Sequence, residues 1–467
     1  MDRNSDNQGT SRNTILLAAV ISAFLTPFMG SALNLALPSI GREFDADTLL
    51  LGWIPTAYLL SSAVFLVPFG RIADIYGRRM IFLWGMVIFT LASLGSAISP
   101  GIGILLFVRV IQGIGSAMMF ATGVAIVTAV FPAEERGRAF GLTIAAVYVG
   151  LSAGPFAGGI LTEQFGWRSI FIFTTIAGIT GVYFLASRIR GEWIGAAGEP
   201  FDLKGSVIYG MSLFLLIYGL SNLPAITGFA CLGAGIAGIV IFVFVEINTR
   251  YPVMQLRLFA GNAVFAWSNA AALINYSATF AVAFILSLYL QYIRGYSASD
   301  AGIILVSQPV IMAVVSPLAG RLSDRVEPRI IATAGMAVTT AGLFLLGFTG
   351  SLGIGAIIAT LVLLGIGFGL FSSPNSNAIM SSVSSRYYGI ASGTMGTMRL
   401  LGQMFSMGIV MVILALFIGR EPVTVQNSGA FLSSVKIVFW LFTGLCFFGI
   451  FASYARGNVR NVKSKQQ

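Results

Sequence analysis

The sequence predicts an all-α polytopic membrane protein with fourteen transmembrane helices, and three observations carry this prediction. Of its 467 residues, 57% are hydrophobic and only 9% are charged, whereas soluble domains carry about 25% charged residues. Apolar runs of about 20 residues, enough to cross a bilayer as a helix, recur along the whole chain. The basic residues are distributed unevenly between alternate loops. We therefore expect a multi-pass protein of the cell membrane (inner or plasma membrane).

The predicted spans are joined by connections too short to fold as separate domains. They cover residues 14–37, 50–70, 80–98, 103–128, 138–161, 168–187, 205–221, 226–246, 263–290, 300–319, 330–348, 353–373, 389–418 and 433–454. Six spans precede residue 190 and six follow residue 262, so the pair between them is an insertion. We expect an N-terminal six-helix bundle (1–190), a linker with two inserted helices (191–262) and a C-terminal six-helix bundle (263–467).

The basic residues predict how the chain is oriented in the membrane. If loops are assigned alternately to two sides, twenty of the 27 Lys and Arg residues fall on the side that holds both termini. Five fall on the other side, and Arg109 and Arg399 lie within spans. Loops on the cytoplasmic side of membrane proteins carry an excess of Lys and Arg. Both termini are therefore predicted to be cytoplasmic, which requires an even number of spans.

The composition also excludes several classes of function. The net charge of +10 follows from the loop bias, so no nucleic-acid partner is expected. The chain has no His, and its two Cys lie in apolar spans, so we expect no metal site and no cofactor. None of the four Lys residues stands in a Gly-Lys-Ser/Thr element that would bind ATP. No catalytic triad, dyad or metal cluster indicates an enzyme.

A short motif occurs in corresponding loops of the two halves. Residues 70–79 read GRIADIYGRR and residues 320–329 read GRLSDRVEPR, an offset of 250 residues. Internal repeats are typical of transporters built from homologous halves. The Asp74 carboxylate is suited to pair with a guanidinium or to face a helix N-terminus, and so to latch the cytoplasmic side. The alternative is a set of solvated charges that only determines topology.

One stretch, residues 141–159, is unusually rich in glycine (GLTIAAVYVGLSAGPFAGG). Gly150, Gly154 and Gly158 recur every four residues, so on a helix they form one face that another backbone can approach closely. Pro155 removes a backbone donor in the same run and favours a kink. The pattern predicts a tightly packed, bendable transmembrane helix.

Together these motifs resemble the major facilitator superfamily, and specifically its fourteen-helix drug/proton antiporter branch. The resemblance covers nearly the whole chain and rests on the loop at 70–79, on Arg109 with Gln112, and on the glycine-rich stretch. That stretch matches the antiporter signature at Gly141, Gly150, Gly154, Pro155, Gly158 and Gly159. The resemblance implies the major facilitator fold, in which two six-helix bundles rock about a central site, here with two extra helices between them.

The resemblance also implies which residues gate the transport cycle or couple it to protons. They are Gly70, Asp74, Arg78, Arg109, Gln112 and Asp324. Arg109 lies about six residues, or roughly 10 Å, into its span. A charged residue within a span is costly and faces the bundle interior or a water-filled cavity in most cases. The resemblance associates Arg109 with proton coupling, and the alternative is a structural arginine that donates to backbone carbonyls.

A central cavity is a further implication, and nine polar residues are candidates to line it. They are Asn34, Tyr58, Asn269, Asn275, Tyr276, Asn375, Asn377, Arg399 and Gln403. Hydrogen bonding between helices explains the amides equally well. A structural role is the alternative for Arg399.

Acidic residues are absent from the centres of the predicted spans. All seventeen lie in loops or at span ends, and Met29 stands where the antiporter branch commonly has an acid. Because such antiporters use buried carboxylates to bind cationic drugs and exchange protons, strong selectivity for lipophilic cations is not expected. If transport is coupled to protons, the proton must therefore be carried by acids near the membrane faces. The candidates are Glu43, Asp45, Asp47, Asp74 and Glu246.

Three functions fit these observations. The first is a secondary exporter that moves amphipathic small molecules out of the cytoplasm against a proton gradient by alternating access. The second is a facilitator or importer of a polar metabolite, and the third is a membrane sensor without flux. We expect the first, with a small amphipathic substrate, the proton and the lipid bilayer as partners, and with the chain acting as a monomer.

Overall fold

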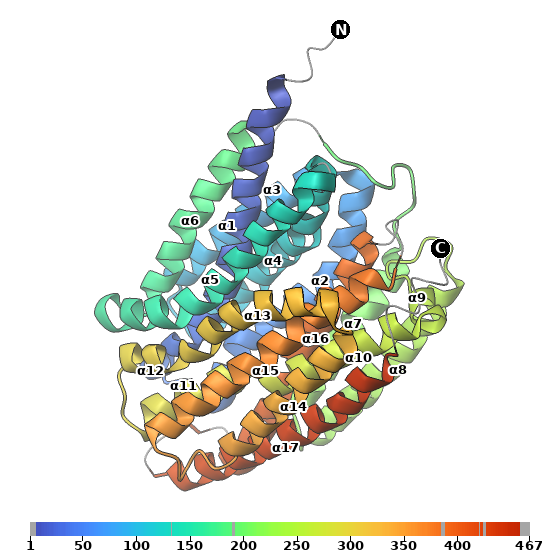
Figure 1. Ribbon diagram of the computed structural model, residues 1–467. Helices are drawn as coiled ribbons and strands as arrows, with labels where there is room; N and C mark the ends of the chain where they lie inside the picture. The colour runs from blue at the N-terminus through green and yellow to red at the C-terminus, as the bar shows by residue number, and fades with distance from the viewer. Residues whose placement is uncertain are drawn as a thin grey trace.

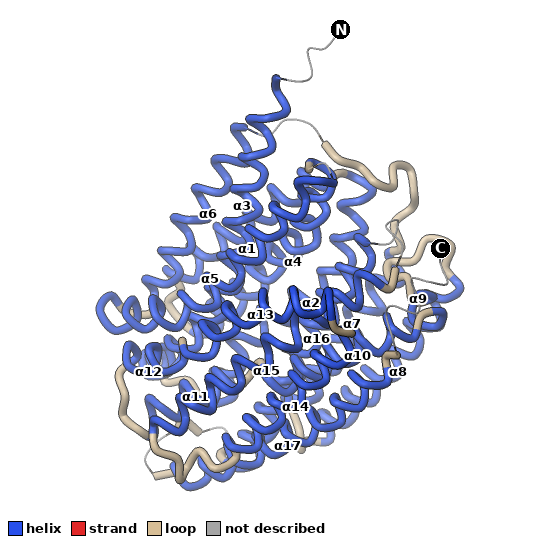
Figure 2. The backbone as a smooth tube through the Cα atoms, viewed as in Figure 1, coloured by secondary structure: helices blue, strands red, loops and turns tan. Residues whose placement is uncertain are grey.

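The computed structural model describes residues 6–131, 133–188, 192–383, 388–419, 421–423 and 426–457. These residues form helices joined by turns and loops (Figure 2). Within them lie fourteen spans that are long and apolar enough to cross a membrane. The prediction of an all-α protein with fourteen spans is therefore confirmed.

The helices fall into two bundles and an inserted hairpin (Figure 1). The first bundle comprises α1 (Asp6–Phe44), α2 (Thr48–Tyr76), α3 (Arg78–Ala97), α4 (Ile102–Val130), α5 (Ala133–Phe165) and α6 (Arg168–Arg188). The hairpin comprises α7 (Leu203–Ser221) and α8 (Ile226–Asn248), followed by the short α9 (Arg257–Gly261). The second bundle comprises α10 (Ala263–Thr279), α11 (Val282–Leu288), the π-helical turn η1 (Tyr289–Ile293), α12 (Ala298–Leu305), α13 (Ser307–Arg325), α14 (Pro328–Leu346), α15 (Ile354–Ser381), α16 (Tyr388–Phe417) and α17 (Ser428–Ala455).

Several spans are longer than the sequence predicts, and some of them are interrupted. The span predicted at 263–290 is interrupted between α10 and α11, and it continues through η1 to Ile293. At the interruption the amide of Ala281 donates to Ser406 Oγ at 3.1 Å. A break in a transmembrane helix requires such a substitute partner, because no water is available in the bilayer core. The first helix extends to Phe44 rather than ending at residue 37.

Within each bundle the helices pack closely against one another, although one hydrophobic cluster runs through both bundles. In the first, α1 packs against α5 and α6, while α4 packs against α2 and α3. In the second, α15 packs against α13 and α14, while α10 packs against α16 and α17. The hairpin lies against both bundles, because Tyr209 and Leu213 of α7 share a hydrophobic cluster with Leu60 of α2 and Met404 of α16. Many large apolar side chains elsewhere are exposed, including Ile226 (85%) and Phe448 (68%), as expected of a surface that faces lipid.

The two bundles are joined at one end and diverge at the other. We call the end where α1 begins and α17 ends the termini face, and the other end the opposite face. At the opposite face, Thr48 Oγ1 of α2 donates to the carbonyl of Glu421 at 2.5 Å. Figure 1 shows α5 and α12 side by side at the left, while the bundles diverge toward the upper right, where α1 begins and α17 ends.

Candidate transport site

Side chains from both bundles lie close enough to interact electrostatically near the middle of the molecule. They are Tyr58 of α2, Tyr148 of α5, Tyr276 of α10 and Arg399 of α16, which we call the central cluster. The guanidinium of Arg399 lies 5.6 Å from the centre of the Tyr276 ring, and its charge reaches the phenols of Tyr58 and Tyr148. Arg399 is half-buried, and none of the ion pairs between described residues includes it. The cluster thus combines three phenols with one positive charge.

Tyr148 is a member of this cluster that the sequence analysis missed. Its hydroxyl donates to Ser316 Oγ of α13 at 2.6 Å and so connects the two bundles near the centre of the molecule. The sequence did offer a signal that could have identified this residue, because Tyr148 is the one phenol in the glycine-rich stretch 141–159. A hydroxyl among small apolar residues of a transmembrane helix needs a hydrogen-bond partner.

Arg109 and Gln112 form a buried network within the first bundle. Arg109 is fully buried, donates to the carbonyl of Ile54 at 3.2 Å and to the side-chain carbonyl of Gln112. Gln112 in turn donates to Ser93 Oγ at 2.7 Å. The guanidinium also lies 4.4 Å from the centre of the Tyr58 ring. Arg109 therefore links α2, α3 and α4 and acts on the central cluster through Tyr58.

The hydroxyl of Tyr58 faces the same helix. It donates to Ser116 Oγ of α4 at 2.7 Å, and the ring is 6% exposed. Gly113 allows this contact, because a Cβ there would collide with Ser61 Oγ and the Tyr58 carbonyl. Helix α4 therefore contacts both ends of this side chain, Ser116 at the hydroxyl and Arg109 at the ring.

Most of the predicted amides lie inside the second bundle. Asn269, Asn275 and Asn375 have 0%, 0% and 2% of their surface exposed. The Asn375 side chain donates to the carbonyl of Ser268 at 3.1 Å, and Asn377 donates to Ser323 Oγ at 2.9 Å. In this conformation Asn375 and Asn377 connect helices, the alternative that the sequence left open.

The remaining candidates lie closer to the interface between the bundles. Asn34 and Gln403 are 6% and 8% exposed. The carbonyl of Asn34 accepts from Ser287 Oγ of the second bundle at 2.6 Å. Pro38 has no N–H to offer this carbonyl four residues back, so the hydroxyl of another helix takes its place. A proline inside α1 thereby creates an acceptor for the contact between bundles.

The predicted cytoplasmic loop pairs with the linker before α7. Asp74 accepts from Arg78 at 2.8 Å, and its carbonyl accepts from the amides of Gly195 and Ala196 at 3.0 and 2.8 Å. Arg71 pairs with Glu199. The Asp74 loop is therefore engaged with a neighbouring segment of chain, and nothing in the described residues ties it to the second bundle.

A second linker carboxylate caps the helix after this loop. Glu192 accepts from the amides of Arg79 and Met80 at 2.6 and 3.1 Å, at the N-terminus of α3. The turn requires glycine at 77, where φ is 129° and a Cβ would collide with Glu192. Gly70 has only Ala121 near its missing Cβ, at 3.8 Å. The side chain of Asp324, the counterpart of Asp74, lies outside the described residues.

The glycine-rich helix α5 packs mainly against α1 of its own bundle. A Cβ at Gly150 would approach the carbonyl of Phe24 to 2.5 Å, and one at Gly158 would approach the Cα of Ala32 to 2.7 Å. A Cβ at Gly154 would collide with the side chain of Ser31. The predicted close approach of two backbones is present on this face.

The other side of α5 meets the second bundle. A Cβ at Gly159 would approach the carbonyl of Ala298 to 2.5 Å, and one at Gly302 would collide with the carbonyl of Pro155. Glu163 accepts from the amide of Ser299 at 3.0 Å, at the start of α12. Gly141 has no atom within 4 Å of its missing Cβ. The signature thus serves two interfaces, and Gly159 with Pro155 serves the one between bundles.

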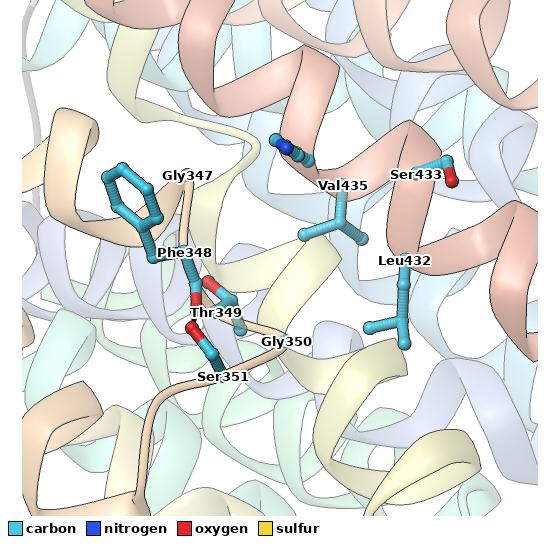
Figure 3. Close-up of a pocket in the computed structure, with 9 residues that line it drawn as sticks. Gly347, Phe348, Thr349, Gly350, Ser351, Leu432, Ser433 and Val435 are labelled. Atoms are coloured by element: carbon cyan, nitrogen blue, oxygen red, sulfur yellow. Dashed lines mark hydrogen bonds between the residues drawn. The ribbon is translucent and has the colours of Figure 1, made fainter.

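A pocket of about 270 Å³ lies elsewhere, at the opposite face (Figure 3). It is formed by residues 347–351 of the α14–α15 connection and by Leu432, Ser433, Val435 and Lys436 of α17. All of these belong to the second bundle, so the pocket does not lie where a substrate would pass between the bundles.

Comparison with known proteins agrees with this arrangement. The sequence profile of the Major Facilitator Superfamily matches residues 19–407 and 268–466. The chain is 29% identical over 442 residues to the riboflavin transporter RibZ of Clostridioides difficile (strain 630), covering 93% of this chain and 95% of that protein. It is 31% identical over 415 residues to the multidrug resistance protein Stp of Mycobacterium tuberculosis (strain CDC 1551 / Oshkosh), covering 87% of this chain and 77% of that protein.

A solved structure has the same fold. It is a bacterial homologue of the human lysosomal transporter Spinster, in an inward-facing and unoccupied conformation. It matches 96% of this chain and 97% of that one, with a TM-score of 0.71 and 16% identity. Because two bundles, fourteen spans and a profile match over nearly the whole chain coincide, the protein belongs to the Major Facilitator Superfamily and is a membrane transporter rather than an enzyme.

Proposed function

We propose that this transporter is a secondary exporter that moves amphipathic small molecules out of the cytoplasm by alternating access, driven by a proton gradient across the cell membrane. The observation that carries the proposal is the central cluster, to which both bundles contribute. A site shared by two bundles changes its access when they rock against each other. The relative Stp is named as a multidrug resistance protein, which supports export.

The central cluster also favours one charge type of substrate. Tyr148 and Tyr276 supply half-buried aromatic rings, and the half-buried guanidinium of Arg399 supplies a positive charge without a carboxylate partner among the described residues. Aromatic rings bind planar apolar groups, and a guanidinium binds carboxylate or phosphate groups. We therefore favour amphipathic substrates that are neutral or anionic over lipophilic cations.

Transport into inside-out membrane vesicles tests the exporter. Two fluorescent substrates of similar size, one anionic and one cationic, are supplied with a proton gradient. We expect the vesicles to accumulate the anionic substrate and an uncoupler to abolish this accumulation. Uptake of the anionic substrate should fall at least tenfold in Arg399→Gln, and in Arg399→Lys it should lie between that of Arg399→Gln and that of the wild type. Accumulation that is insensitive to the uncoupler would remove the proton from the mechanism, and preference for the cation in the wild type would contradict the role of Arg399.

Proton movement is measured separately as a substrate-dependent pH change in proteoliposomes. Asp74→Asn and Arg109→Ala are the informative variants, because the sequence resemblance places both residues in coupling. We expect both to reduce the pH change per substrate transported. If both remain fully coupled, neither residue carries the coupling.

A second candidate is a facilitator or importer of a polar metabolite on the same fold. The relative RibZ, a riboflavin transporter, supports it. Under this alternative a hydrophilic solute would raise the melting temperature of the purified protein and lipophilic dyes would not. Under the exporter proposal the dyes stabilise the protein.

A further inference from the structure

We propose that Asp202 and Glu246, at the base of the inserted hairpin, share a single proton and form a proton-binding site. Asp202 immediately precedes α7, and Glu246 lies in the last turn of α8, so the antiparallel packing of the hairpin brings them together. The two residues are 44 positions apart in the sequence. Their site lies at the termini face, at the ends of α7 and α8 rather than at the centre of either span.

Each carboxylate uses one oxygen to hold the backbone. Asp202 Oδ1 accepts from the amide of Gly205 at 2.9 Å and caps α7. Glu246 is 2% exposed, and its Oε2 accepts from the amide of Met254 at 3.0 Å. These bonds fix the orientation of both side chains.

The second oxygen of each carboxylate has no donor. Asp202 Oδ2 and Glu246 Oε1 are both buried, and neither has a hydrogen-bond partner among the described residues. Both oxygens lie 2.4 Å from the position that a Cβ on Gly205 would occupy, so they are neighbours at most twice that distance apart. A nearly fully buried carboxylate thus aims an unpaired oxygen at a second one.

The basic side chains around the site are engaged elsewhere or exposed. Arg71 of α2 pairs with Glu199. Arg257 donates to the carbonyl of Ile247 at 2.9 Å, and Arg250 lies 5.3 Å from the Tyr251 ring. Lys204 of α7 is exposed. Two ionised carboxylates in contact would repel each other strongly away from water, whereas one proton converts the contact into a hydrogen bond.

The bond from the Met254 amide to Glu246 fastens the hairpin to the segment that leads into the second bundle. Met254, which Glu246 holds, packs with Tyr209 and Phe242 in the cluster that joins the hairpin to α2 and α16. Removal of the proton would push the two carboxylates apart and loosen this junction. The site supplies a buried acid to a chain whose span centres have none, and only its use as the coupling site rests on the proposed function.

Infrared difference spectroscopy of the full-length protein in lipid nanodiscs tests the site. Glu246→Gln and Asp202→Asn keep both backbone hydrogen bonds and replace the proton by an amide donor. At pH 7 we expect the carbonyl band of a protonated carboxyl group in the wild type and its loss in both variants. Glu199→Gln, which removes a different carboxylate of the same face, is the matched control and should keep the band.

Three outcomes would overturn the proposal. They are the absence of the band in the wild type, its persistence in Glu246→Gln, and its loss in Glu199→Gln alone. If the band is absent and Na⁺, K⁺ or Ca²⁺ raises the melting temperature of the wild type but not of Glu246→Gln, the pair binds a cation instead. The band is measured without transport, so it remains informative if proton coupling fails in proteoliposomes.

Discussion

At Arg109 a guanidinium inside a transmembrane bundle is stabilised by groups from three helices. It donates to a carbonyl of α2, to Gln112 of its own helix, and through Gln112 it is connected to Ser93 of α3. The ring of Tyr58 covers it at 4.4 Å. A planar guanidinium with five donors suits this arrangement, because it reaches several acceptors at once while its face rests on the ring.

The first prediction concerns Arg109→Lys. An ammonium keeps the charge but is too compact to serve Ile54 and Gln112 together, which leaves a buried acceptor unpaired at a cost of about 1–3 kcal/mol. We expect a lower melting temperature and loss of transport. Arg78→Lys is the control for melting temperature alone, since its ion pair with Asp74 is partly exposed and contributes up to about 1 kcal/mol. A variant Arg109→Lys that melts and transports like the wild type would disprove the network.

A second prediction concerns the hydrogen bond between Tyr148 and Ser316. Tyr148→Phe and Ser316→Ala each remove the same bond, which contributes about 1 kcal/mol. Each should therefore change substrate affinity and melting temperature by a similar amount. The double variant should add little to either single one, as a double-mutant cycle would show. Additive effects would mean that the two hydroxyls act independently.

At the scale of the helix, α5 shows how one sequence pattern serves two partners. Gly150, Gly154 and Gly158 lie on α1, and Gly159 lies on α12. A helix has room for both, because residues three and four apart share a face while the next residue points about 100° away. The sequence pattern predicts that one face of the helix lacks side chains, but it does not predict which helix packs against that face.

The third prediction compares two glycines of α5. In Gly154→Ala the new methyl group meets Ser31 and the amide of Ala32, the latter at 3.0 Å, so overpacking should destabilise the protein by about 1–3 kcal/mol. In Gly141→Ala the methyl group meets nothing within 4 Å, and the helix should gain up to about 1 kcal/mol. The melting temperature should therefore fall in Gly154→Ala and stay the same or rise in Gly141→Ala. Equal shifts would contradict the packing of α5 on α1.

At the scale of the whole molecule, the bundles are joined at the opposite face and separated at the termini face. Ser287 bonds to Asn34, Thr48 to Glu421, and Ser299 to Glu163. These are single hydrogen bonds at an interface, each with a net contribution of about 1 kcal/mol. An interface of this kind is suited to separate and re-form, which alternating access requires.

The fourth prediction uses a cross-link across this interface. With Cys231 and Cys446 replaced by Ser and Ala, the variant Glu163→Cys/Ser299→Cys places two thiols where α5 meets α12. A short bifunctional methanethiosulfonate, which joins the two thiols through disulfide bonds, should hold the opposite face closed and stop transport, and a reductant should cleave these disulfides and restore it. The two single-cysteine variants are controls that the reagent should leave active. Full transport by the cross-linked protein would show that this face need not open.

Much of the fold and part of the site followed from the residues alone. The fourteen spans and the close approach of another helix to the glycine face of α5 were predicted correctly. Tyr148 was missed because its role depends on Ser316, a residue 168 positions away. The docking of Glu192 and Glu199 on the loop at 70–79 was also missed, because a linker rich in mixed charges does not reveal its partner.

The order of the amino acids was enough to predict how many helices cross the membrane, where they lie in the chain and which of their faces carry glycine or polar residues. The physical reason is that a span satisfies its backbone hydrogen bonds internally and needs only apolar length to be stable in lipid. The tertiary structure alone decided which side chains meet. The central cluster and the pair of Asp202 and Glu246 join residues far apart in the chain, and their chemistry exists only once the helices have packed.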